Sequence, residues 1–126
     1  MTSKPKNFGE LELVESTEWF TWLKINHGKK LGAWVVFPKK EINEPSITFE
    51  EALDIALCYG WIDISIRRID ERTYGRKFTP RREKSAWSET NIKRVQVLER
   101  QRKMTKWGLE VYRRRLERTQ RKLGGR

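Results

Sequence analysis

The chain has 126 residues, of which 37% are hydrophobic and 36% charged, and this length favours a single domain. No apolar run approaches the roughly 20 residues of a membrane-spanning helix, and no apolar segment follows the N-terminal residues. We therefore expect a cytoplasmic protein without a membrane span or signal peptide. One cysteine, Cys58, and one histidine, His27, exclude an internal disulfide and a Cys/His zinc cluster. Because the sequence also has no glycine-rich phosphate loop, we expect no metal and no cofactor.

The positive charge lies in the second half of the chain. Lysine and arginine total 28 against 17 aspartates and glutamates, a net charge of +11. Residues 1–60 hold 7 basic and 9 acidic side chains, a net of −2, whereas residues 61–126 hold 21 and 8, a net of +13. A surface of one sign attracts polyanions, of which nucleic acid is the commonest and an anionic membrane surface the rival.

Two short strands and two helices are predicted in the first half. Leu11 and Leu13 alternate with glutamates, as in a strand, and Ser16 or Thr17 can cap the helix that follows. That helix is expected to face a core with Trp19, Phe20, Trp22 and Leu23. Residues 31–37 have the apolar pattern of a buried strand. A capping box at Thr48 and Glu51 begins the second helix, and Gly60 ends it.

A β-hairpin is predicted next. Residues 61–67 alternate strictly, which directs Ile62, Ile64 and Ile66 to one face of a strand. The other face of the same strand carries Trp61, Asp63, Ser65 and Arg67. Residues 70–72 have the composition of a turn, and residues 74–79 that of the return strand, so the sheet is expected to be at least partly antiparallel.

Two basic helices are predicted at the C-terminal end. Ser88 can cap a helix to about residue 101, and Thr105 can cap a last helix over residues 106–122. The predicted fold class is therefore α+β, with a small, mostly antiparallel sheet and about four helices. We expect one domain over residues 1–105, with the basic helix and tail of residues 106–126 packed on it.

Three motifs resemble the YdeI/OmpD-associated family, whose members are often labelled bacteriocin-protection proteins. The first is Thr-Phe-Glu-Glu-Ala-Leu-Asp-Ile-Ala-Leu-Cys-Tyr-Gly-Trp-Ile-Asp at residues 48–63. The second is Phe-Thr-Pro-Arg-Arg at residues 78–82 with Ser-Ala-Trp-Ser at residues 85–88, and the third is Met-Thr at residues 104–105 with Gly108. The resemblance implies a role in resistance to bacteriocins or other peptides through a protein partner, or an association with an outer-membrane porin. It implies no catalytic mechanism, and the basic tail departs from the family pattern.

A small-ligand pocket is one candidate site. A carboxylate, a guanidinium and indole rings suit a small polar or phosphorylated ligand. Its candidate residues are Trp61, Asp63, Ser65, Arg81, Trp87 and Ser88. The alternative is structural, with Asp63 paired to an arginine that fixes the strand to the following loop.

Catalysis has weaker support in the sequence. Cys58 with His27 as base would form a nucleophilic pair, but a cysteine at the end of a buried helix is usually a small apolar filler. The sequence therefore leaves an enzyme uncertain and leans against one.

A nucleic-acid interface with little sequence specificity is the favoured function, through DNA or RNA and including the ribosome. Its candidate residues are Arg67, Arg68, Arg76, Lys77, Arg81, Arg82, Lys84, Lys93, Arg114, Arg118, Arg121 and Lys122. The hypothesis requires these cations to form one continuous surface. Of the aromatic residues between them, we expect Trp87 to be buried, and Trp107 is equally consistent with burial and with exposure as a stacking platform.

Overall fold

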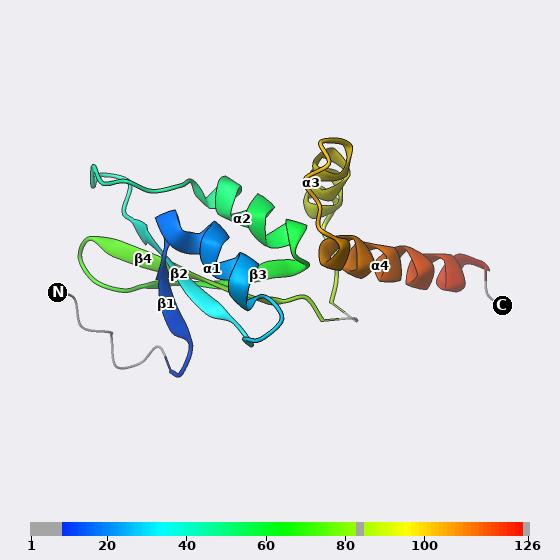
Figure 1. Ribbon diagram of the computed structural model, residues 1–126, viewed down its shortest axis with the longest axis horizontal. Coiled ribbons are helices and arrows are strands. Elements are labelled where there is room, and N and C mark those ends of the chain that lie inside the picture. The colour runs from blue at the N-terminus through cyan, green and yellow to red at the C-terminus, as the bar shows by residue number, and fades with distance from the viewer. Residues whose placement is uncertain (1–8, 83–84, 125–126) are drawn as a thin grey trace.

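The computed structural model describes residues 9–82 and 85–124, with residues 121–124 described by their backbone alone. These residues form four strands, four α-helices and one short 3-10 turn (Figure 1). In chain order they are β1 (Glu12–Glu15), η1 (Ser16–Glu18), α1 (Trp19–Asn26), β2 (Ala33–Pro38), α2 (Phe49–Cys58), β3 (Trp61–Arg68), β4 (Thr73–Pro80), α3 (Glu89–Arg100) and α4 (Lys106–Gly124).

The four strands form one mixed sheet in the order β1-β2-β4-β3. β1 runs parallel to β2, with Glu12 beside Ala33, and the two other pairings are antiparallel. Because β3 and β4 form a hairpin, β3 lies at one edge of the sheet and β4 joins it to β2. The α+β prediction, with a mostly antiparallel sheet and four helices, is confirmed.

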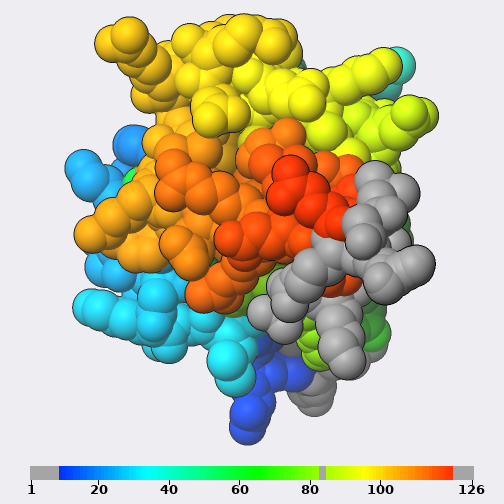
Figure 2. Space-filling model, turned by 90° about the vertical axis from the view of Figure 1, so that its right-hand side faces the viewer, coloured from blue at the N-terminus to red at the C-terminus, as the bar shows by residue number. Residues whose placement is uncertain are grey.

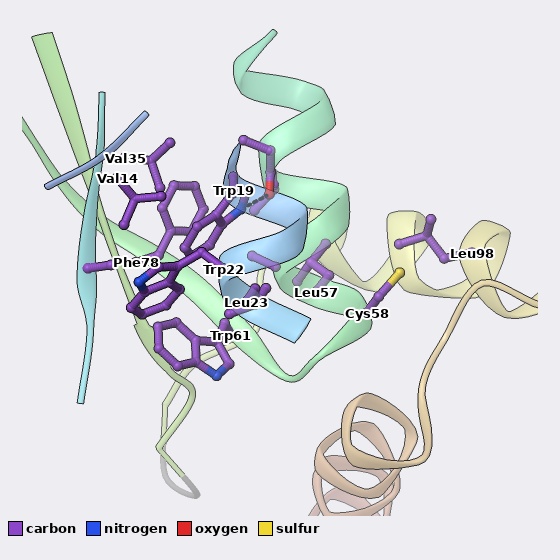
Figure 3. Packing of buried hydrophobic residues seen from close by; sticks show 14 of the residues in the cluster. Val14, Trp19, Trp22, Leu23, Val35, Leu57, Cys58, Trp61, Phe78 and Leu98 are labelled. Carbon is purple, nitrogen blue, oxygen red and sulfur yellow. Dashed lines mark hydrogen bonds between the residues drawn. The ribbon is translucent and has the colours of Figure 1, made fainter. Parts of the chain in front are cut away.

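Helices α1 and α2 cover one face of the sheet and enclose the core. Trp19 is fully buried, stacks on Trp22 at 5.6 Å between ring centroids, and meets the edge of Trp61 at 6.1 Å. Its indole nitrogen donates a hydrogen bond to the Ala52 carbonyl at 3.1 Å, which ties α1 to α2 (Figure 3). A buried indole N–H needs such a partner, so the tryptophans fix how the two helices sit as well as supplying apolar area.

The predicted N-caps of α2 and α3 and the predicted end of α2 are present. The Thr48 hydroxyl accepts a hydrogen bond from the Glu51 amide, and the Glu51 carboxylate accepts one from the Thr48 amide, which completes the capping box. Ser88 caps α3 by accepting from the Asn91 amide at 3.1 Å. Gly60 follows α2 with a φ of +79°, in the left-handed region that favours glycine.

Two details of α1 differ from the prediction. Neither Ser16 nor Thr17 caps it, because residues 16–18 form a 3-10 turn and the N-cap position falls to Glu18, whose side chain makes no capping bond. Ser16 is instead buried against Ser46, with 2.8 Å between the two hydroxyl oxygens. Phe20 is 53% exposed and outside the core, because the short helix buries a narrower stripe than the apolar pattern implies.

The strict alternation predicted for β3 is also wrong. A bulge between Asp63 and Ser65 inserts one unpaired residue, after which the side chains exchange faces. Trp61 is buried, whereas Ile64 and Ile66 beyond the core are exposed on the edge strand. A bulge on an edge strand bends it and disturbs pairing with other chains.

Helix α4 is held to the rest of the protein by its first turns. The Thr105 hydroxyl donates to the Cys58 carbonyl at the end of α2, and Tyr112 is buried against Trp87. The second half of α4 extends away from the sheet (Figure 1), and Leu116 there is 38% exposed. Among residues 9–82 and 85–124, no helix combines the length and the apolar composition needed to cross a bilayer.

Candidate nucleic-acid interface

Those predicted cations whose side chains the structure describes do not form one continuous patch. Arg67 and Arg68 lie at the turn end of the β3–β4 hairpin, whereas Arg114 and Arg118 lie on α4 at the opposite end of the molecule (Figure 1). The antiparallel hairpin explains the separation: Trp61 and Pro80 are paired at its α4 end, and the seven steps to Arg68 span about 24 Å.

Arg76 and Arg81 are partly buried and are held by contacts within the protein. Arg76 approaches the Asp63 carboxylate at 3.4 Å, and its guanidinium lies 3.9 Å from the centre of the Phe49 ring. Arg81 covers the Trp87 ring at 3.9 Å and donates hydrogen bonds to the Ser85 hydroxyl and the Ala86 carbonyl. Asp63 therefore pairs with an arginine, as the structural alternative expected, but this arginine lies on the neighbouring strand β4 and not in the loop that follows. Arg76 contacts α2 through Phe49, and Arg81 holds the end of β4 to Trp87.

The other predicted cations are dispersed. Lys77 is half-buried on β4, and Arg82 and Lys93 are exposed after β4 and on α3. Lys84 lies outside the described residues, as do the side chains of Arg121 and Lys122, although their backbone is helical.

The residues predicted to form a small-ligand pocket do not line one pocket together, and most of them have separate structural roles. Trp61 belongs to the core, Asp63 pairs with Arg76, and Ser88 caps α3. Ser65 is exposed opposite Lys77, beyond the β3 bulge. Arg81 contacts Trp87 as predicted, and Trp61 and Arg81 line a different hollow, described next.

That hollow, which we call the basic groove, lies between the start of α4 and the ends of α1, α2 and β4. Figure 2 shows this end of the molecule, with α4 across the middle, α3 above it and the segment after α1 below. Its volume is about 440 Å³, within the range of small-ligand sites. It is lined by His27, Tyr59, Gly60, Trp61, Pro80, Arg81, Lys106, Trp107, Glu110, Val111 and Arg114.

Three aromatic rings from three different elements meet in the basic groove. Tyr59 and Trp107 are nearly parallel, with 14° between their planes and 6.3 Å between centroids. His27 is tilted against both, at 4.9 Å from Tyr59 and 4.3 Å from Trp107. Trp107 is 47% exposed, so of the two alternatives left by the sequence it is the exposed one. Trp87, which was expected to be buried, is half-buried and packs against the core from outside.

The charges around these rings are mostly positive. Arg81, Lys106 and Arg114 face a single acid, Glu110, which pairs with Arg114 at 3.4 Å while both side chains are more than half exposed. Burial lowers the pKa of Arg81 to about 10, so its guanidinium stays charged at neutral pH. Burial also lowers the pKa of His27, which is therefore mainly neutral at pH 7 and adds a ring but no charge.

The proposed Cys58–His27 pair does not fit the structure. Cys58 is buried at the end of α2 beside Leu98 (Figure 3), and burial raises the pKa of its thiol to about 11. His27 instead packs on Tyr59 and Trp107. A protonated, buried thiol is a poor nucleophile, which removes the basis for this catalytic pair.

Sequence reasoning missed His27 and Tyr59 as members of a binding surface. Each residue ends or follows a helix, and the packing of the start of α4 against Gly60 and Cys58 brings α4 beside them. Trp107, Val111 and Arg114 line the groove together because they lie three and four residues apart on one helix.

Comparison with known proteins gives one match. A sequence-family model described as a domain of unknown function, DUF8412, matches residues 11–111. Neither a curated protein nor a solved structure matches the chain. The matched region ends on the second turn of α4, so it includes most of the basic groove and stops before the arginines of residues 113–118.

Proposed function

Because the chain belongs to the DUF8412 family of domains of unknown function, we propose its function from the basic groove: the protein binds nucleic acid, DNA or RNA, with little sequence specificity. The proposal replaces the continuous surface of twelve cations that the sequence hypothesis required, which the described residues do not form, with the smaller set of cations at α4. The observation that carries this proposal is an exposed tryptophan, Trp107, within a groove whose cations outnumber its acids by three to one. Phosphate contacts supply most of the affinity of such interfaces, and aromatic rings supply stacking.

Lys106 and Arg114 of the groove are exposed and available to a phosphate, whereas Arg81 is held by Ser85, Ala86 and Trp87. Glu110 and Arg114 form an exposed ion pair, a class of interaction that stabilises by only about 0–1 kcal/mol. A phosphodiester can therefore replace Glu110 as the partner of Arg114, and a guanidinium matches it with two parallel hydrogen bonds. Arg118 lies one turn further along α4, so the same face of the helix continues the positive surface beyond the groove.

The composition of the groove favours binding without sequence preference. Its rings present flat faces, and its cations end long, flexible chains. Base sequence is read by donors and acceptors placed against base edges, whereas rings and cations recognise features that every nucleotide shares.

Two other hypotheses stay predictions. The resemblance to the YdeI/OmpD-associated family implies a peptide-resistance role through a protein partner, and association with the ribosome would narrow the nucleic-acid proposal. A ligand or enzymatic role for Asp63, Arg81 and Trp87 has less support, because Asp63 and Arg81 already have partners within the protein.

A salt series tests the proposal. If Lys106, Arg114 and Arg118 each contact a phosphate of a single strand, the slope of log affinity against log salt is about −2. We expect Arg114→Gln with Arg118→Gln to bring the slope to about −0.7 and to weaken binding below about 200 mM salt. Fluorescence anisotropy with a labelled oligonucleotide measures both quantities.

The chain offers a control with the same charge. Lys40→Gln with Arg68→Gln also lowers the net charge of +11 by two, but at the hairpin end of the molecule. We expect this pair to change the slope by less than about 0.3. Equal losses from both pairs would show diffuse attraction to a basic protein and contradict a site at α4, and binding that does not depend on salt would contradict the proposal altogether.

A further inference from the structure

We propose, building on the nucleic-acid function above, that the cluster of His27, Tyr59 and Trp107 takes an unpaired nucleobase while Lys106 and Arg114 hold its phosphate. The ligand class is a nucleotide whose base is free to stack. The protein then prefers single strands to duplexes, a preference that phosphate contacts alone do not produce.

The arrangement of the rings points to a flat ligand. Tyr59 and Trp107 lie within 14° of parallel, and His27 leans against both, so the cluster holds Trp107 in a fixed orientation. The remaining exposed part of Trp107 opens on the groove. Inside a duplex the faces of each base are covered by its neighbours, so only an unpaired or terminal base can stack there.

The charge around the cluster distinguishes a nucleotide from a cationic ligand. Such clusters also bind quaternary ammonium groups by cation–π attraction. Here the neighbours are Arg81, Lys106 and Arg114 against one acid, and the Lys106 ammonium already lies 5.1 Å from the centre of the Trp107 ring. A second cation would be repelled, whereas an anion bearing an aromatic base is attracted at both ends.

The first test compares one sequence in two forms. An oligonucleotide of about 12 residues without internal pairing is measured as a single strand and as its duplex, with the intact protein. We expect the single strand to bind about 5- to 100-fold more tightly, the range for stacking one base on an aromatic ring. Trp107→Ala is expected to remove that preference and leave duplex binding unchanged, while Trp107→Phe keeps it within about threefold.

A matched control is another exposed aromatic residue. Phe20 is 53% exposed on α1, outside the basic groove, and Phe20→Ala is expected to leave both affinities unchanged. Thermal unfolding followed by circular dichroism checks that each variant is folded.

Free nucleotides test the site in wild-type protein. Adenosine monophosphate, adenosine and ribose 5-phosphate are titrated separately by calorimetry. We expect the monophosphate to bind most tightly and to compete with the single strand, since only it has both the base and the phosphate. If only strands bind, with the preference above, the site needs a nucleotide within a chain, which also supports the assignment.

The outcomes separate this inference from the proposed function. Equal binding of single strand and duplex, or a preference that survives Trp107→Ala, would overturn the base site and leave salt-dependent nucleic-acid binding in place. Failure of the wild-type protein to bind either form would overturn both. Ribose 5-phosphate binding as tightly as the monophosphate would also reject the base site, because the phosphate alone would then explain the affinity.

Discussion

Cys58 illustrates how burial sets the chemistry of one side chain. The thiol lies at the end of α2, where it contributes to the core, and desolvation disfavours its charged form. Its position in the sequence beside an apolar helix face already favoured a packing role. The raised pKa makes that expectation measurable.

We expect Cys58 to react slowly with a thiol reagent such as Ellman's reagent in the folded protein. Its pKa is raised from 9.0 to about 11, so near pH 8 the folded protein holds about a hundredfold less thiolate than the unfolded chain. The measurement is the reaction rate with and without guanidinium. Similar rates in the two states would mean that the thiol is accessible and ionised, and would reopen its role as a nucleophile.

The same thiol makes stability depend on alkaline pH. The folded protein retains the proton to a higher pH than the unfolded chain, so this contribution is complete below pH 9 and is lost as the pH rises through about 11. Arg76 and Arg81 show that residue type alone does not identify a binding site. Arginine is typical of phosphate sites, but the contacts of these two side chains hold the sheet to Phe49 and Trp87.

At the scale of the elements, the junction of α2 and α4 builds the basic groove. The Thr105 hydroxyl bonds the Cys58 carbonyl and also accepts a hydrogen bond from the Gly108 amide, so one side chain both caps α4 and ties it to α2. Gly108 allows the close approach, because a Cβ there would lie 2.3 Å from the Cys58 carbonyl oxygen.

Gly108→Ala is therefore expected to destabilise the protein by about 1–3 kcal/mol, the usual cost of overpacking, although alanine is the better helix former by about 1 kcal/mol. Urea unfolding measures the change. Gly28→Ala is the control, since a Cβ at residue 28 meets nothing within 4 Å and should leave the midpoint nearly unchanged. A stable Gly108→Ala protein would contradict the tight α2–α4 contact and with it the placement of Trp107.

At the scale of the whole molecule, the folded core and the most basic segment are largely separate. The buried residues extend to Tyr112, close to the end of the family match at residue 111. Beyond residue 111, α4 extends away from the sheet (Figure 1). Its exposed arginines face solvent, so we expect them to contribute little to the stability of the fold.

Ending the chain at Glu117 is expected to change the free energy of unfolding by less than about 1 kcal/mol, since surface changes rarely exceed this. The same truncation removes four basic residues, which lowers the net charge from +11 to +7, and should weaken binding to single strands. Tyr112→Ala provides the contrast, with an expected loss of about 3 kcal/mol from a buried ring. A truncated protein as unstable as Tyr112→Ala would place the second half of α4 in the core.

The sequence by itself determined the fold class, the capping box at Thr48 and Glu51, the stop at Gly60 and the uneven charge, because each depends on residues close together in the chain. The tertiary structure decided which cations are neighbours, that the β3 bulge ends the alternation, and that His27 and Tyr59 meet Trp107. Those relations join residues up to 80 positions apart, from His27 to Trp107. Hydrophobic patterns and helix or strand propensities depend on residues a few positions apart. Which distant residues become neighbours depends instead on the packing of the tryptophan core and on the α2–α4 contact.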